Sequence, residues 1–262
     1  MSILLEDLDD GVLTLTLNRP EKRNALSLEL AEALIEALRR ARSNPDVRSI
    51  LIAGSGSAFC VGGDVAEISE ENLTASSLET QSAQLQAATE AALLLHDIPK
   101  PTIAAMRGGV AGAGLSLALS CDIRIASDAL KMTSAFVKVG LSGDFGGSYF
   151  LNKLLGPRAR QFIMMSPVVL ADAALDLGLV SEVVADAGLE AHSTTVARQL
   201  ADGPSIALGY IKENLNFAEQ GASLAETLRH ESLRHMRCVT TEDHREGAAA
   251  FFEKRPPRFR HR

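Results

Sequence analysis

The chain has 262 residues, of which 46% are hydrophobic and 23% are charged, as is typical of one large domain or of a domain with a helical appendage. No apolar run approaches the roughly 20 residues that cross a bilayer, and the acidic N-terminus differs from the basic, apolar start of a secretory signal. The formal net charge of -7 disfavours general nucleic-acid binding, because neutralising phosphates requires a basic face. We therefore expect a cytoplasmic protein with neither a nucleic-acid nor a membrane partner.

The cysteine and histidine residues suggest no metal site. Three cysteines lie far apart along the chain, which favours neither a disulfide framework nor a zinc motif. The six histidines show no metal-ligand spacing, and we expect most of them on the surfaces of helices.

The first half of the chain predicts alternating strands and helices. Apolar and hydroxyl residues alternate with period two over residues 12–17, which indicates a half-buried strand. Ser27 stands where an N-cap would, and apolar residues then recur at three- and four-residue spacing as in an amphipathic helix. The expected order is strand 12–17, helix 28–44, strand 49–53, helix 76–96, strand 102–106, helix 113–120 and strand 122–126. From about residue 148 the pattern becomes almost wholly helical, so the sequence predicts an α/β core with a helical C-terminal layer.

Two glycine-rich turns, at residues 58–64 and 107–114, each follow a strand and precede a helical stretch. Such turns present unpaired backbone N–H groups that a ligand can approach closely. One N–H group from each turn can converge on a thioester carbonyl oxygen and stabilise an enolate. The alternative is that both turns are structural, with glycine required for positive φ or tight packing.

Other nucleotide and nucleophile motifs are incomplete. Residues 54–59 begin like a dinucleotide fingerprint but end in Phe59, and the chain has no P-loop. Residues 114–118 resemble a nucleophile elbow in which Ala118 replaces the second glycine. Ser116 is therefore interpreted first as a helix-lining residue.

Several motifs, in this order and spacing, resemble the enoyl-CoA hydratase/isomerase (crotonase) superfamily. They cover nearly the whole chain: NRPEKRNAL at 18–26, AFCVGGD at 58–64, PTIAA at 101–105, ALSCDIRIA at 118–126, KVGL at 138–141, GPRA at 156–159, the segment 171–184 and EGAAAFFEKR at 246–255.

The resemblance implies a crotonase-like spiral of ββα repeats with a C-terminal helical trimerisation region. We expect a core with the CoA site at residues 1–200, a helical region at 201–262, and a homo-trimer or a dimer of trimers. The implied partner is an acyl-CoA thioester of the kind found in fatty acid metabolism, with no separate cofactor.

The resemblance also implies roles for individual residues. Gly63 and Ala113 would supply the two oxyanion-hole N–H groups. Lining the CoA nucleotide or the acyl group would be Lys22, Arg23, Ala25, Leu26, Val61, Asp64, Ser116 and Phe136. The Lys22-Arg23 pair suits CoA phosphates, although alone it would be interpreted as a solvated turn. The basic tail at 254–262 either contacts CoA or is a disordered end.

The hydratases of this superfamily use two glutamates, and the matching positions here are Ser116 and Phe136. Neither side chain transfers a proton as a carboxylate does. One carboxylate remains at another family position: Asp144 resembles the aspartate of the double-bond isomerases. Apolar neighbours such as Phe136 and Phe145 would raise its pKa toward the working range. The structural alternative is that Asp144 caps the helix that follows.

The sequence therefore favours an enoyl-CoA isomerase. The second candidate is an enoyl-CoA hydratase, which is a lyase, in which Asp144 with water or Ser116 replaces the glutamates. A non-catalytic acyl-CoA-binding protein and a hydrolase or dehalogenase remain alternatives. The acyl pocket is expected around Phe136 and the loop at 69–82, with Glu67, Glu70 and Glu71 either closing over the acyl chain or solvated.

Overall fold

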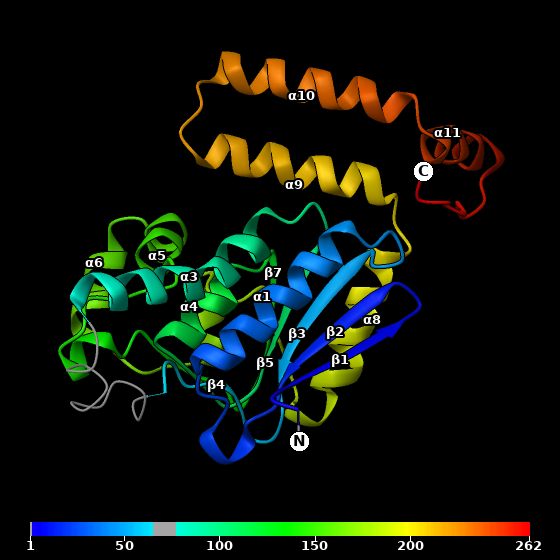
Figure 1. Cartoon of the computed structure of the whole chain (residues 1–262). Helices are drawn as coiled ribbons and strands as arrows, with labels where there is room; N and C mark the ends of the chain where they lie inside the picture. The colour runs from blue at the N-terminus through cyan, green and yellow to red at the C-terminus, as the bar shows by residue number, and fades with distance from the viewer. Residues whose placement is uncertain (1, 65–76) are drawn as a thin grey trace.

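The computed structural model describes residues 2–64 and 77–262 of the chain. Figure 1 shows a twisted sheet with α1 (Leu28–Ser43) and α3 (Leu78–Asp97) on one face and α8 (Leu189–Ala201) on the other. Successive side chains of a strand point to opposite faces of the sheet, and both faces carry apolar residues. Leu13 and Leu15 belong to the core under α1, whereas Val12 packs with α8.

Two sheets form within the described residues. The larger has six strands in the order β1-β2-β3-β5-β7-β10, parallel except for the β1-β2 pair, and the smaller has four in the order β4-β6-β8-β9. The strands are β1 (Leu4–Asp9), β2 (Val12–Leu17), β3 (Ser49–Gly54), β4 (Ala58–Cys60), β5 (Thr102–Met106), β6 (Gly109–Ala111), β7 (Ile123–Ser127), β8 (Lys131–Thr133), β9 (Val169–Leu170) and β10 (Glu182–Val184).

The helices begin largely where the sequence predicts them. Ser27 caps α1 as expected, because its hydroxyl accepts a hydrogen bond from the Leu30 N–H at 3.2 Å. The other helices are α4 (Ala113–Leu119), α5 (Gly147–Leu155), α6 (Arg158–Met165), α7 (Ala171–Asp176), α9 (Ser205–Glu219), α10 (Leu224–Val239) and α11 (Glu242–Glu253). Short 3-10 helices lie at η1 (Pro20–Lys22), η2 (Phe136–Val139) and η3 (Asp186–Gly188).

Short strands are the main departure from the predicted elements. Each glycine-rich turn contains a three-residue strand, and these two strands, β4 and β6, pair in parallel. Strand β1 was not predicted, and β9 and β10 interrupt a region expected to be almost wholly helical. Strands β4, β6, β9 and β10 have two or three residues each, too few for a periodic pattern, and their pairing partners are distant in sequence. Strand β1 has six residues and pairs with the neighbouring β2, but its acidic residues hide the alternation of a half-buried strand.

The helical C-terminal part leaves the core after α8, and α9 and α10 lie side by side beyond it (Figure 1). A buried lysine anchors α9: Lys212 Nζ donates to an Asp122 carboxylate oxygen at 2.8 Å and to the Leu95 carbonyl at 2.7 Å. The same Asp122 oxygen accepts from the Thr102 N–H and hydroxyl, so it orients the start of β5.

No helix in the described part of the chain is long and apolar enough to span a membrane. The same residues contain no group of three or more His, Cys, Asp or Glu side chains arranged to hold a metal ion. Glu67, Glu70, Glu71 and the first part of the predicted 69–82 loop lie outside the described residues, and residues 78–82 belong to α3.

Candidate functional site

The two glycine-rich turns meet at the edge of the smaller sheet. Leu26 donates its N–H to the Gly62 carbonyl at 2.8 Å, and its own carbonyl accepts from the Asp64 N–H at 2.9 Å. Because successive backbone groups of an extended chain point to opposite edges, the Gly63 N–H faces away from Leu26. That orientation turns it toward the side on which β4 pairs with β6.

Glycine is required where the turns touch. Gly62 and Gly112 have φ angles of 106° and 54°, which disfavour any side chain. A Cβ atom on Gly62 would lie 3.7 Å from the Ala113 nitrogen, and one on Gly112 would lie 3.6 Å from the Gly62 Cα. Ala113 is the first residue of α4, so its N–H has no acceptor within that helix. The Gly63 and Ala113 N–H groups are therefore on adjoining turns.

Asp144 lies in an irregular segment between η2 and α5. Gly143 and Phe145, on either side of it, both have positive φ, at 116° and 50°. Its Oδ1 atom is buried and makes no hydrogen bond with any described residue. Burial in this environment raises the pKa of the carboxyl from 3.8 to about 6.

The helix-capping alternative for Asp144 does not match the geometry. The N-cap of α5 is Gly146, and no side chain donates or accepts a capping bond there. Asp144 contributes only its backbone carbonyl, which accepts from the Gly147 N–H at 3.0 Å. One oxygen of this half-buried side chain, Oδ1, is thus buried without a hydrogen-bond partner, and such an exception calls for an explanation, a functional role among them.

One cavity of about 510 Å³ brings these groups together. Gly63, Ala113 and Asp144 all line it, and so do Leu26, Asp64 and Phe136 among the other residues singled out from the sequence. The volume is within the usual range of a small-molecule site. Gly63, Ala113 and Asp144, from three separate chain segments, therefore line a common space.

Asp64 and Asp144 are the acidic residues among the described lining of this cavity, and they differ in charge environment. Arg19 forms an ion pair with Asp64 at 2.7 Å and donates to the Ala25 carbonyl at the same distance. No described cation pairs with Asp144. Of the two acidic residues in this described lining, Asp144 is therefore the one without an ion-pair partner.

Phe136 and Ser116 have different positions relative to the cavity. The Phe136 ring is within 3.8 Å of the positions that Cβ atoms on Gly112 and Gly143 would take, so it lies between the Gly112 turn and the Asp144 segment. Ser116 is buried inside α4 and donates its hydroxyl to the Gly112 carbonyl at 3.3 Å. It does not line the cavity.

Four other residues expected at the CoA lie outside the cavity lining. Lys22 and Arg23 are exposed at η1, next to the buried Ala25. Val61 is half-buried, and a Cβ atom on Gly109 would lie 3.1 Å from its Cγ1. All four flank the Gly63 end of the site in sequence or in space.

Sequence reasoning assigned no role to several residues that shape the site, although Asn24 lies inside the motif at 18–26. Asn24 is fully buried, donates to the Ser55 and Ala58 carbonyls at 2.9 and 2.8 Å, and accepts from the Arg19 N–H. It thereby ties the 18–26 segment to the strand that leads to Gly63. Leu85 and Ala88 of α3 line the cavity because of helix packing, which local spacing does not reveal.

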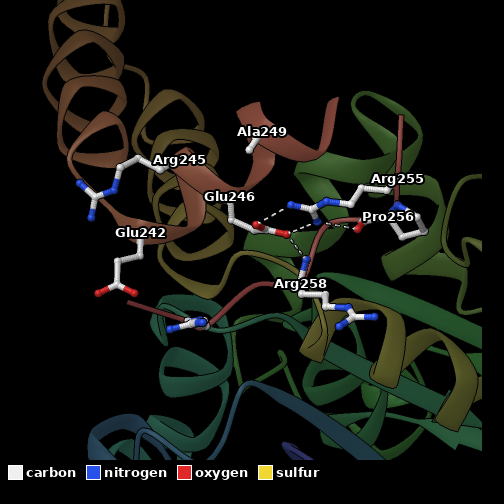
Figure 2. Close-up of a pocket in the computed structure, with 8 residues that line it drawn as sticks. Glu242, Arg245, Glu246, Ala249, Arg255, Pro256 and Arg258 are labelled. Carbon is white, nitrogen blue, oxygen red and sulfur yellow. Dashed lines mark hydrogen bonds and ion pairs between the residues drawn. The ribbon is translucent and has the colours of Figure 1, made fainter. Parts of the chain in front are cut away.

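A larger cavity of about 830 Å³ lies between α11 and the tail (Figure 2). Its lining is mainly charged, and Arg255 pairs with Glu246 at 2.6 Å. That contact holds the pKa of Glu246 down at about 2, the opposite of the shift at Asp144. This cavity therefore differs from the Asp144 cavity, because its Glu246 carboxyl group is held ionised by a paired arginine.

Comparisons with known proteins agree with this geometry. The family model described as "Enoyl-CoA hydratase/isomerase" matches residues 7–262. A probable enoyl-CoA hydratase of Rhodobacter capsulatus is 35% identical, over 97% of this chain and 96% of its own. The 1,2-epoxyphenylacetyl-CoA isomerase of Escherichia coli is 34% identical, over 99% of this chain and 98% of its own. The crystal structure of an enoyl-CoA hydratase from Polaromonas sp. JS666 is similar with a TM-score of 0.93 and 35% identity, covering 98% of this chain and 99% of that one.

Proposed function

The chain belongs to the enoyl-CoA hydratase/isomerase family, and from this premise we propose that it is an enoyl-CoA isomerase in which Asp144 moves the proton. The expected α/β fold with a helical C-terminal region is confirmed by the structural similarity, whereas trimer formation stays a prediction. The observation that carries the choice of isomerase is the half-buried Asp144 carboxyl group, whose Oδ1 atom is buried without a hydrogen-bond partner, in a cavity whose other described acidic residue is bound to arginine.

The proposed reaction needs one acid-base group. The Asp144 carboxylate removes a proton from C2 of a 3-enoyl thioester, and the electron pair moves onto the thioester oxygen as a dienolate. The Gly63 and Ala113 N–H groups donate hydrogen bonds to that oxygen. Asp144, now protonated, returns the proton at C4, and the double bond ends between C2 and C3. Atoms and charge balance without a cofactor.

The pKa of Asp144 supports this role. A carboxyl group with an ordinary pKa is a weak base, whereas one near 6 both accepts and returns a proton near neutral pH. Hydration places a further demand on the site, because water must also be deprotonated. Ser116, the residue at one hydratase glutamate position, is buried in α4 away from the cavity lining and supports no such step.

The residues that flank the Gly63 end of the cavity indicate where the CoA part of the substrate would lie. We propose that the CoA nucleotide lies along Lys22, Arg23, Ala25 and Leu26, with Val61 and Asp64 beside it. Lys22 and Arg23 are exposed, as phosphate-binding cations must be.

We further propose that α9, α10 and α11 form the contacts of a homo-trimer or a dimer of trimers, because they expose large apolar side chains such as Leu215, Leu224 and Phe252.

The test measures isomerisation and acyl-CoA binding in an Asp144 variant, and hydration in the wild type. Asp144→Ala should lower isomerisation of a 3-enoyl-CoA by about 10²-fold or more and leave acyl-CoA binding within a factor of about two. Asp46→Ala, at an exposed position between α1 and β3, is the matched control. Full isomerase turnover in the Asp144 variant would overturn the assignment. Faster hydration of crotonyl-CoA than isomerisation by the wild type would identify a hydratase, and binding without turnover would identify a binding protein.

A further inference from the structure

The Arg19 side chain joins the two chain segments that meet beside Gly63. Its Nη1 atom donates to the Ala25 carbonyl at 2.7 Å, and its Nη2 atom donates to an Asp64 carboxylate oxygen at 2.7 Å. Asp64 follows Gly63 in the chain, and Ala25 precedes Leu26, which forms a parallel bridge with Gly63. One guanidinium group therefore contacts both segments of this bridge.

The same bridge sets the direction of the Gly63 N–H. The Leu26 N–H donates to the Gly62 carbonyl at 2.8 Å, and the Leu26 carbonyl accepts from the Asp64 N–H at 2.9 Å. The Gly62 carbonyl and the Gly63 N–H belong to one trans peptide unit, in which the two groups point in opposite directions. The Gly63 N–H consequently points away from Leu26 for as long as these hydrogen bonds are kept.

Two consecutive glycines make this peptide unit easy to rotate. Gly62 has a φ of 106°, and neither it nor Gly63 carries a Cβ atom that would restrict the backbone. The direction of the N–H must therefore be held by contacts outside the two glycines. The two hydrogen bonds of Arg19 supply such contacts, because they fix the residues on either side of the bridge.

The Arg19–Asp64 ion pair is well shielded from solvent. The side chains of Arg19 and Asp64 are 17% and 9% exposed, against 59% and 40% for the Arg40–Glu6 pair on the surface. A shielded pair keeps its geometry, because separating the partners leaves a charge unpaired in a poorly hydrated place. The pair therefore acts as a fixed restraint, whereas the exposed pair exchanges readily with water.

Arg19 is itself held by the buried Asn24. The Arg19 N–H donates to Asn24 Oδ1 at 2.8 Å, and the Asn24 amide donates to the Ser55 and Ala58 carbonyls at 2.9 and 2.8 Å. Asn24 is fully buried. The guanidinium thus reaches Asp64 from a position fixed to the chain that enters β4.

We propose that Arg19 is a positioning residue for the reaction: its bridge between Ala25 and Asp64 holds the Gly63 N–H in the direction that donates to the thioester oxygen. The inference rests on the proposed function in one respect, because the thioester oxygen must lie between Gly63 and Ala113. Arg19 is not among the residues that line the cavity, so it acts through the turn and not on the substrate. A donor aimed at developing negative charge matters more in the transition state than in the bound substrate, so loss of Arg19 should reduce kcat more than affinity.

The carbonyl stretching frequency of a bound thioester reports this hydrogen bond without any turnover. Difference infrared spectra of the full chain with butyryl-CoA, isotopically labelled at the thioester carbonyl, would give the frequency. We expect binding to the wild type to lower it, since a donated hydrogen bond weakens the C=O bond. In Arg19→Met about half of that shift or more should be lost, with the Kd of butyryl-CoA within about threefold of the wild type. Arg40→Met, which breaks the exposed pair with Glu6, is the matched control and should change neither quantity.

Steady-state kinetics give a second readout. On a 3-enoyl-CoA, Arg19→Met should lower kcat by about tenfold or more and keep KM within about threefold. Loss of folded protein alone would also lower kcat, but it would leave the carbonyl frequency of the thioester on the folded fraction unchanged. The two measurements together therefore separate positioning from stability.

A carbonyl shift in Arg19→Met as large as in the wild type would overturn the inference. Should that variant fail to fold, Arg19→Lys carries the test, because lysine keeps the charge but its single nitrogen does not reproduce the two-nitrogen bridge of a planar guanidinium. We expect a smaller shift there than in the wild type, and a full shift would overturn the inference. No carbonyl shift in the wild type would instead refute the proposed oxyanion site, and the role of Arg19 with it.

Discussion

Gly147 lies directly against Ser116: a Cβ atom on Gly147 would come 2.5 Å from the Ser116 hydroxyl oxygen. Gly147 is the first residue of α5 and follows Asp144 by three positions, while Ser116 is in α4, which begins at Ala113. The close approach of the two helices therefore sets where the Asp144 segment stands relative to the Ala113 N–H.

Gly147→Ala should consequently damage both stability and catalysis. The added methyl group must either displace the buried Ser116 hydroxyl from its hydrogen bond with the Gly112 carbonyl or separate α4 from α5, and we expect a loss of about 1–3 kcal/mol in the free energy of unfolding. Asp144 should move with α5, so kcat should fall more than acyl-CoA affinity. Urea denaturation and steady-state kinetics measure the two effects. Gly188→Ala is the control, because a Cβ atom there meets no atom within 4 Å; equal effects from both variants would contradict the argument.

The activity should depend on the ionisation of Asp144. As the base it must be deprotonated, and its pKa in the folded protein is raised by burial to about 6. We expect kcat/KM for isomerisation to rise with pH through about 6 and then level off, as measured on a 3-enoyl-CoA across pH 4.5 to 8. A profile already flat down to pH 4.5 would mean that no carboxyl with a raised pKa takes part.

Asp144→Asn should stabilise the fold at neutral pH. The pKa of the aspartate is raised on folding, so ionisation favours the unfolded chain, and the wild type loses stability as pH rises from about 4 to above 6. Asparagine does not titrate. The gain in urea midpoint over wild type should therefore be larger at pH 7.5 than at pH 4.5. Asp46→Asn, at an exposed site, should show no such difference; a gain independent of pH would point to a cause other than ionisation.

Lys212→Met should loosen α9 from the core. Lys212 is 6% exposed and donates to Asp122 and to the Leu95 carbonyl, so its loss leaves buried acceptors unpaired. We expect a loss of about 2–3 kcal/mol in the free energy of unfolding. The exposed Arg39–Glu90 pair offers a contrast, and Arg39→Met should cost less than about 1 kcal/mol. Chemical denaturation gives the free energy of unfolding of both variants. A loss at Lys212 as small as that at Arg39 would contradict the expectation.

Much of the core was predictable because its signals are local. Period-two alternation predicts β2, and three- and four-residue spacing after a capping serine predicts α1, with bounds close to those observed. Strands β4 and β6 escaped prediction because a three-residue strand carries no period and is defined by its partner. The ion pair of Arg19 with Asp64 joins residues 45 positions apart, and no motif spacing announces it.

The sequence by itself determined which chemical groups are present: glycines at two turns, and Asp144 where Ser116 and Phe136 carry no carboxylate. Tertiary structure decided which residues lie next to those groups and how much water reaches them. The two turns meet because β4 pairs with β6, and the pKa of Asp144 rises because packing removes water from its carboxyl oxygen. Desolvation and long-range strand pairing depend on the surroundings of a residue, and local sequence does not encode those surroundings.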